Sequence, residues 1–388
     1  MLVLVATLAI QALTSMAVLM PAVYVGVAAP EIGVDPSRIG AFVAVIYLAA
    51  AVTTANCGGP IRRWGALRVS QLALLATAIG LALYVTAVPA LVLLGGLIVG
   101  VGMGPITPSS AQLLIHRTPP HRRSLVFSLR QTGVPLGNAL AGAIVPPLVL
   151  GLGWRGTTLA VAVVCAVLAL AVEPLRATLD ADVGPRAAGE RAAGPAYGAV
   201  LRSPMLLRLA SGSIGFVAMQ MCFSAFIVTF LTTENGIDLA VAGLVLSVSQ
   251  VAAMGARILW GWIADRFVAP RKLLCLLGLG MAASGAVFAL VTASWPIVVV
   301  AAITVAIGAT AIGWNGVLIA EVAHLAPRGA VGAATGATLS FTFLGAVIAP
   351  PLFSALVDWT GGYRTAFLAA ALCAGAGGIV IGRGARSG

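Results

Sequence analysis

The sequence predicts an all-α membrane protein with twelve transmembrane helices, arranged as two pseudo-symmetric bundles of six helices. Three observations support this prediction: the composition, a series of long apolar stretches, and a repeat between the two halves of the chain. Of the 388 residues, 60% are hydrophobic and only 9% are charged, and the mean hydropathy is +1.08. Soluble domains carry about 25% charged residues, so the composition excludes a large soluble fold.

Twelve stretches are long and apolar enough to cross a bilayer, which takes about 20 mostly apolar residues. The predicted spans are 2–29, 38–57, 68–88, 90–115, 124–150, 154–173, 204–232, 239–264, 272–292, 296–322, 332–357 and 362–382. The first stretch lacks the basic start and the cleavage site of a signal peptide, so it is predicted to be a membrane helix.

A polar connector divides the chain into two halves. Residues 174–203 are rich in Pro, Gly and Ala and predict a flexible cytoplasmic linker. The predicted domains are therefore an N-terminal six-helix bundle at 1–173, the linker at 174–203, and a C-terminal six-helix bundle at 204–388.

The basic residues predict the orientation, because cytoplasmic loops carry an excess of Lys and Arg. With both termini in the cytoplasm, the outer loops contain only Arg38, Arg155 and Arg364 of the 22 basic residues. The single lysine, Lys272, among many arginines, together with abundant Gly and Ala, indicates a GC-rich bacterial genome. We therefore expect a multi-pass protein of a bacterial inner membrane.

The two halves repeat each other. The stretch AGAIVPPLVLGLGWRGTTLAVAVVCA at 141–166 resembles LGAVIAPPLFSALVDWTGGYRTAFLAAALCA at 344–374. The loop CGGPIRRWGALR at 57–68 likewise matches WGWIADRFVAPRK at 260–272. Repeats of this kind place a binding site between the halves, near the middle of the bilayer.

These features resemble the major facilitator superfamily, and the resemblance covers the whole chain. The most specific element is the loop after the second helix of each half, G-x-x-x-D-R-x-G-x-R-[KR] in the family. The second copy has Gly261, Asp265, Arg266, Arg271 and Lys272, with Val268 in place of the glycine. The first copy keeps Gly58, Arg63, Gly65 and Arg68 but has Arg62 where the acid belongs. The resemblance implies the major facilitator fold and transport by alternating access.

A second family feature is an acid at the cytoplasmic end of the fourth helix of each half, followed by a proline and a basic residue. Glu321, with Pro327 and Arg328, fits this pattern, but the first half has Gln112 there. The resemblance implies that these residues form a charge network that latches the cytoplasmic side. The expected latch residues are Gly261, Asp265, Arg266, Arg271 and Glu321, with Gly58, Arg63 and Gly65 in the first half. Because the first half lacks both acids, its latch is expected to be weaker.

Two arginines, Arg130 and Arg257, lie inside predicted spans. A charge there costs about 2.5–3.5 kcal/mol on insertion scales and usually faces a cavity. All 11 Asp and Glu residues fall at helix ends or in loops, so a substrate is the expected counter-ion. A guanidinium binds a carboxylate with two parallel hydrogen bonds. In the family the fifth and eighth helices meet between the halves. The resemblance therefore implies that the two arginines face each other across the transport route.

Each arginine also has a simpler interpretation. Arg130 could extend along its own stem to the cytoplasmic surface, and Arg257 could belong to the latch. Arg257 is also similar in position to the eighth-helix arginine of oxalate and monocarboxylate carriers, within the pattern R-x-x-x-G-x-x-x-D. However, Ala253 replaces the acid of animal monocarboxylate carriers, and 332–357 contains no basic residue. The resemblance therefore does not imply a particular substrate.

Other polar and aromatic residues are candidates for the same cavity, because the resemblance implies that the first, fourth, seventh and tenth helices line it. The candidate substrate-binding residues besides the arginines are Gln11, Tyr24, Tyr47, Gln220, Gln250, Trp314 and Asn315. For each residue, a hydrogen bond between helices is the alternative.

The sequence thus favours a carrier of a small organic anion, with a carboxylate as the leading candidate and a proton or a counter-anion as the coupled species. The alternatives are an exporter of hydrophobic drugs or metabolites and a non-transporting sensor or scaffold. We expect no enzyme, because the chain has no nucleophile–base pair or phosphate-binding loop. No metal or cofactor is expected, since the cysteines form no CxxC and lie near no histidine. The expected partners are the substrate and the lipid bilayer, with no nucleic acid, and the expected state is a monomer.

Overall fold

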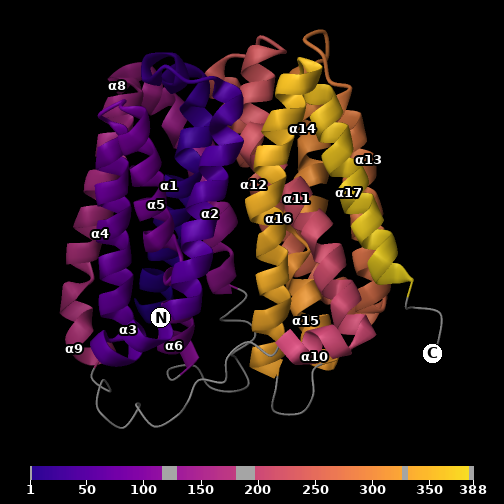
Figure 1. Ribbon diagram of the computed structural model, residues 1–388, viewed down its shortest axis with the longest axis horizontal. Helices are drawn as coiled ribbons and strands as arrows, with labels where there is room; N and C mark the ends of the chain where they lie inside the picture. The colour runs from indigo at the N-terminus through magenta and orange to yellow at the C-terminus, as the bar shows by residue number, and fades with distance from the viewer. Residues whose placement is uncertain (1, 116–128, 181–196, 326–330, 384–388) are drawn as a thin grey trace. The chain divides into compact units, whose positions relative to one another are not determined.

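The computed structural model describes residues 2–115, 129–180, 197–325 and 331–383 (Figure 1). Contacts within the chain divide it into two compact units. Unit 1 comprises Met1–Pro36 and Val45–Ala192, and unit 2 comprises Ser37–Ala44 and Ala193–Gly388. Each unit is described by itself below.

The first half of the chain is helical throughout its described residues. Its elements are α1 (Leu2–Ile32), η1 (Pro36–Arg38), α2 (Ile39–Asn56), α3 (Gly58–Trp64), α4 (Ala66–Tyr84), α5 (Pro89–Met103), α6 (Ile106–Ile115), α8 (Gly133–Ala171), η3 (Glu173–Leu175) and α9 (Arg176–Leu179). The long helices α1, α4 and α5 run alongside one another, in indigo and purple in Figure 1.

The second half is also built of helices. Its elements are α10 (Tyr197–Arg202), α11 (Pro204–Thr233), α12 (Leu239–Arg266), α13 (Pro270–Ala289), α14 (Ile297–Ile307), η5 (Gly308–Ile312), α15 (Asn315–Leu325), α16 (Val331–Thr360) and α17 (Tyr363–Gly382). Helix α17, in yellow in Figure 1, packs along both α13 and α11.

The described residues contain 11 helical segments long and apolar enough to cross a membrane. One of them, α8, has 39 residues and contains a non-helical glycine, Gly153, with φ of +71°. The element consists of two helices that meet in a kink at Gly153, where a positive φ favours glycine. The kink falls between the predicted fifth and sixth spans, 124–150 and 154–173. The all-α membrane fold is confirmed, and the count agrees with twelve spans; residues 124–128 of the fifth span lie outside the described part.

Close helix packing in each unit depends on glycine. In unit 1, a Cβ atom added to Gly137 of α8 would overlap the carbonyl oxygen of Ala12 on α1. In unit 2, a Cβ atom on Gly212 of α11 would lie 2.6 Å from the carbonyl oxygen of Gly377 on α17. Small residues allow helix backbones to approach in this way in membranes.

Large apolar side chains face outward from the helices. Leu150, Leu170, Val298 and Leu372 are each more than 60% exposed. Such exposure is unfavourable in water but suits contact with lipid tails, so these faces are expected to meet the hydrocarbon core.

The predicted linker at 174–203 has helical elements at both of its described ends. These are η3 and α9 on one side and α10 on the other, and residues 181–196 lie outside the described part. Near the first of these ends, Asp180 accepts hydrogen bonds from the start of α4.

Candidate functional site

One membrane-spanning segment of each half is interrupted within its length. In the first half, Pro89–Leu114 divides into α5 and α6 at Gly104 and Pro105, where proline cannot donate the helical hydrogen bond. In the second half, Ile297–Val322 divides into α14, the π-helical turn η5, and α15. These are the fourth and tenth predicted spans, so the breaks occupy corresponding positions in the repeat. Paired interruptions of this kind mark binding sites in repeat-built membrane proteins.

Arg130 lies at the break of the first half and is 2% exposed. Its Nη2 donates to Gln11 Oε1 at 2.5 Å and to the carbonyl oxygen of Ile106 at 3.4 Å. The same nitrogen lies 3.4 Å from Thr107 Oγ1, and Nη1 donates to Gln131 Oε1 at 3.0 Å. The Nε of Arg130 is buried and has no hydrogen-bond partner among the residues that the structure describes. The guanidinium thus retains an unused donor.

These acceptors on Arg130 are all uncharged. Within the described ranges, no carboxylate forms an ion pair with Arg130. A buried charge without a counter-ion is strongly unfavourable, so the site suits an anion from outside the protein. The burial also disfavours the alternative in which Arg130 extends to the surface.

Gln11 is held in place from two sides. Its Nε2 donates to Ser15 Oγ at 3.1 Å, which leaves Oε1 directed at the guanidinium. A Cβ atom added to Gly133 would lie 3.0 Å from the Gln11 side chain. Glycine at 133 therefore lets α1 approach α8 closely enough for Gln11 to reach Arg130.

Arg257 lies at the break of the second half, on α12. Its Nε donates to the carbonyl oxygen of Ile312, the last residue of η5, at 3.2 Å. The Nδ2 of Asn315 also donates to this oxygen, at 3.4 Å. A π-helical turn displaces its carbonyls from the regular helical pattern, which makes them available to side chains.

Two tryptophans use other carbonyls of the same turn. Trp260 Nε1 donates to Ala309 O at 2.7 Å, and Trp314 Nε1 donates to Ala311 O at 2.9 Å. Trp314 Nε1 also donates to Gln220 Oε1 at 3.2 Å. The structure therefore brings Gln220, Trp314, Asn315 and Arg257 together around η5.

The packing of η5 against α12 leaves no room for a side chain at Gly308, where a Cβ atom would overlap the carbonyl oxygen of Ser249. We expect Gly308→Ala to lower the stability of the purified protein by about 1–3 kcal/mol, the usual range for overpacking. The matched control is Gly316→Ala, because nothing lies within 4 Å of the corresponding Cβ position. Thermal unfolding in detergent checks this, and equal unfolding temperatures for both variants would contradict the packing.

The remaining predicted site residues take no part in the hydrogen bonds of Arg130 and Arg257 described above. The Tyr24 hydroxyl accepts a hydrogen bond from Thr158 Oγ1 at 2.9 Å, and its ring packs near Trp154. It lies about 20 Å from Gln11 along α1, so it does not join the Arg130 cluster. Tyr47 is half-buried on α2. Gln250 is fully buried and precedes Arg257 by two turns of α12, about 10 Å.

The latch predicted for the second half contains an ion pair. The Arg271 Nε donates to Glu321 Oε1 at 2.5 Å, and Glu321 is 3% exposed. Arg266 is exposed, and Gly261 has open space around its Cβ position. The side chain of Asp265 lies outside the described part, as do Pro327 and Arg328.

In the first half, the loop before α4 is held by a carboxylate that the motif does not contain. Gly65 has φ of +97°, a conformation that favours glycine. The two carboxylate oxygens of Asp180 accept hydrogen bonds from the backbone N–H groups of Leu67 and Arg68, each at 3.0 Å. Asp180 therefore caps the start of α4. Its carboxylate occupies the position that a Cβ atom at residue 65 would take.

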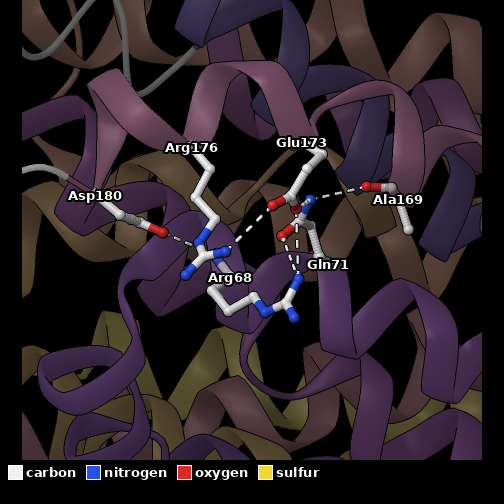
Figure 2. A network of polar contacts seen from close by, with 6 residues as sticks. All are labelled: Arg68, Gln71, Ala169, Glu173, Arg176 and Asp180. Atoms are coloured by element: carbon white, nitrogen blue, oxygen red, sulfur yellow. Dashed lines mark hydrogen bonds and ion pairs between the residues drawn. The ribbon is translucent and has the colours of Figure 1, made fainter.

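A second carboxylate, Glu173, belongs to the same region, and Arg176 is drawn between it and Asp180 (Figure 2). Glu173 accepts hydrogen bonds from Gln71 Nε2 at 2.7 Å, Arg176 Nη1 at 3.2 Å and Arg68 Nη1 at 3.4 Å. Glu173 follows the end of α8. Sequence reasoning did not connect Glu173 and Asp180 with the loop before α4, because both lie more than 100 residues from it along the chain.

We expect Asp180→Ala to destabilise the protein by about 0.5–2 kcal/mol, as for the loss of other helix caps. The matched control is Asp358→Ala, which removes an exposed acid. Unfolding temperatures of the two purified variants check this. A Gly65→Ala variant should also be destabilised, because its Cβ atom would overlap the Asp180 carboxylate.

Comparison with known proteins decides the family. The sequence profile described as Major Facilitator Superfamily matches residues 5–337 and 218–383. The chain belongs to this superfamily. Its fold is similar to that of a bacterial homologue of the human lysosomal transporter Spinster, in an inward-facing and occupied conformation, with a TM-score of 0.77 at 14% identity, over 100% of this chain and 97% of that chain.

Curated relatives share less than a third of their aligned residues with this chain. The chain is 28% identical to the uncharacterized MFS-type transporter MT3072 of Mycobacterium tuberculosis, over 71% of this chain and 59% of the relative. It is 29% identical to monocarboxylate transporter 13 of Rattus norvegicus, over 77% of this chain and 69% of the relative. The match to the mycobacterial superfamily member thus spans about three fifths of that protein's length.

Proposed function

We propose that this superfamily member is a secondary transporter that carries a small organic anion, a carboxylate, by alternating access across a bacterial inner membrane. Both termini lie in the cytoplasm in this proposal. The observation that carries it is the burial of Arg130 among uncharged acceptors, with an unused Nε, at a helix break. The name of the monocarboxylate relative supports the same substrate class.

The second half supplies a matching group in this proposal. Arg257 and Asn315 share the carbonyl oxygen of Ile312 at the π-helical turn, just as Arg130 reaches the carbonyl oxygen of Ile106 after the other break. A carboxylate competes well for such donors, because hydrogen bonds between two charged groups are about twice as strong as neutral ones. We propose that Arg130 and Arg257 both bind the anion and that Trp314 and Gln220 shape its surroundings.

The coupled species in this proposal is a proton carried by the substrate or a counter-anion that is exchanged. All Asp and Glu residues lie at predicted helix ends or in loops, so no acid in the middle of a predicted span is available to carry a proton. An exchanger would require anion on both sides of the membrane, whereas proton-linked transport would respond to the pH gradient.

The test is uptake into proteoliposomes that contain the purified full-length protein. The panel pairs several mono- and dicarboxylates with their uncharged amides and adds inorganic oxyanions, while internal pH and internal anion are varied. We expect saturable uptake of at least one carboxylate and none of its amide. Uptake restricted to neutral apolar compounds would overturn the proposal and favour an exporter of hydrophobic compounds.

A further inference from the structure

A second charged site lies in unit 1, at the end of the helices where α3 leads into α4. A cavity of about 730 Å³ opens there, within the range of about 300–1,000 Å³ that is typical of ligand sites. It is lined by Arg63, Trp64, Arg68, Leu72, Glu173, Pro174, Arg176, Ala177 and Asp180. Arg130 is not among these residues, so the cavity is separate from the site proposed for the transported anion.

The lining of this cavity has an excess of positive charge. It contains three arginines and two carboxylates. Asp180 is already occupied by two backbone N–H groups, and Glu173 is shared by Arg68 and Arg176. Arg63 is exposed and forms no ion pair with any carboxylate in the described part of the chain. An anion could therefore be bound without breaking the existing network.

The arginines can reach a ligand in this cavity. The side chains of Arg68 and Arg176 are 41% and 43% exposed, so each is only partly used by Glu173. In Figure 2 the guanidinium groups of these two residues lie side by side below Glu173. Adjacent guanidinium groups suit a phosphate, which accepts several charge-assisted hydrogen bonds at once.

The border of the cavity is apolar. Trp64 is 47% exposed and Leu72 is 40% exposed, and both line the cavity. Tryptophan is enriched where protein meets the boundary between lipid and water. The loop of Arg63 is also predicted to lie on the cytoplasmic side, where membranes carry anionic lipids. A ligand with a phosphate and an attached apolar chain would match both parts of this surface.

We propose that this cavity binds the headgroup phosphate of an anionic phospholipid from the cytoplasmic leaflet. Arg63, Arg68 and Arg176 hold the phosphate, and an acyl chain lies along Trp64 and Leu72. Glu173 keeps Arg68 and Arg176 together, and Asp180 fixes the start of α4 that positions Arg68. The site is independent of the identity of the transported substrate.

Native mass spectrometry of the detergent-purified, full-length protein tests this proposal. Phosphatidylglycerol and phosphatidylcholine are titrated separately, and the fraction of protein with bound lipid is measured. We expect tighter binding of phosphatidylglycerol. The variant Arg63→Gln/Arg176→Gln is expected to weaken it by about 25-fold, since each basic residue at an anionic membrane surface contributes about fivefold.

Two controls separate the outcomes. Arg202→Gln removes an exposed arginine outside the cavity and should leave lipid binding unchanged. Arg63→Gln alone should weaken lipid binding about fivefold. Because Arg63 forms no ion pair in the described part of the chain, this variant keeps the test valid if the double variant fails to fold. Equal binding of both lipids, or unchanged affinity in these variants, would overturn the proposal. Displacement of lipid by inorganic phosphate at similar concentrations would do the same, because it would show a site for a soluble anion.

Discussion

Replacing Arg130 with glutamine should reduce uptake of the transported carboxylate by about 100-fold, since a hydrogen bond to a charged group contributes about 1.5–3 kcal/mol. Glutamine removes a buried charge rather than creating one, so the variant should fold as well as wild type. Arg130→Lys keeps the charge but loses the planar pair of donors. Its rate of uptake should therefore lie between those of wild type and Arg130→Gln. Initial rates in proteoliposomes, at equal amounts of inserted protein, measure the effect.

Arg257→Gln should show the same loss if both arginines bind the anion, and Arg202→Gln is the matched control for the loss of an arginine outside the site. Wild-type uptake in both Arg130→Gln and Arg257→Gln would contradict the proposed site and would leave the arginines a purely structural role. A loss in Arg130→Gln alone would assign anion binding to the first half.

Replacing Arg271 with glutamine should destabilise the protein by about 3–5 kcal/mol, because it leaves a buried carboxylate without its partner. The carboxylate is Glu321, which is 3% exposed and pairs with Arg271. Thermal unfolding in detergent measures this effect. Arg266→Gln removes an exposed arginine at the end of the preceding helix, α12. It is the matched control and should unfold like wild type.

The double variant Arg271→Gln/Glu321→Gln separates the cost of an unpaired charge from the loss of a contact. It should recover most of the lost stability, because two neutral amides can replace a buried ion pair at little cost. If the double variant is as unstable as Arg271→Gln, the destabilisation does not come from an unpaired Glu321, and the prediction is wrong.

The sequence predicted the fold well because length and apolarity alone specify membrane helices. The kink at Gly153 lies where the sequence predicted the break between the fifth and sixth spans. The hydrogen bonds from the start of α4 to Asp180 could not be predicted, because tertiary contacts have no signature in local composition.

The sequence indicated the charged side chains of the candidate site but not the backbone carbonyl oxygens that they contact. The burial of Arg130 follows from an arginine in a span without a nearby acid, as the sequence indicated. The carbonyl oxygens of Ile106 and Ile312 could not be foreseen, since they become acceptors only where helices break. The signals that could have indicated the breaks are Gly104 before Pro105 and the run GATAIGWNG around η5. Trp260 was missed for the same reason.

The π-helical turn has a mechanical consequence for the second half. A turn of this kind contains one residue more than an α-helix would need, so its gain or loss rotates everything that follows by about 100°. Trp314, Asn315 and Glu321 all follow η5 on one continuous stretch. The loss of that residue from η5 would therefore rotate Asn315 and Glu321 together, because both lie on α15. One helix thus connects the hydrogen bond of Asn315 at the turn to the ion pair of Glu321 with Arg271.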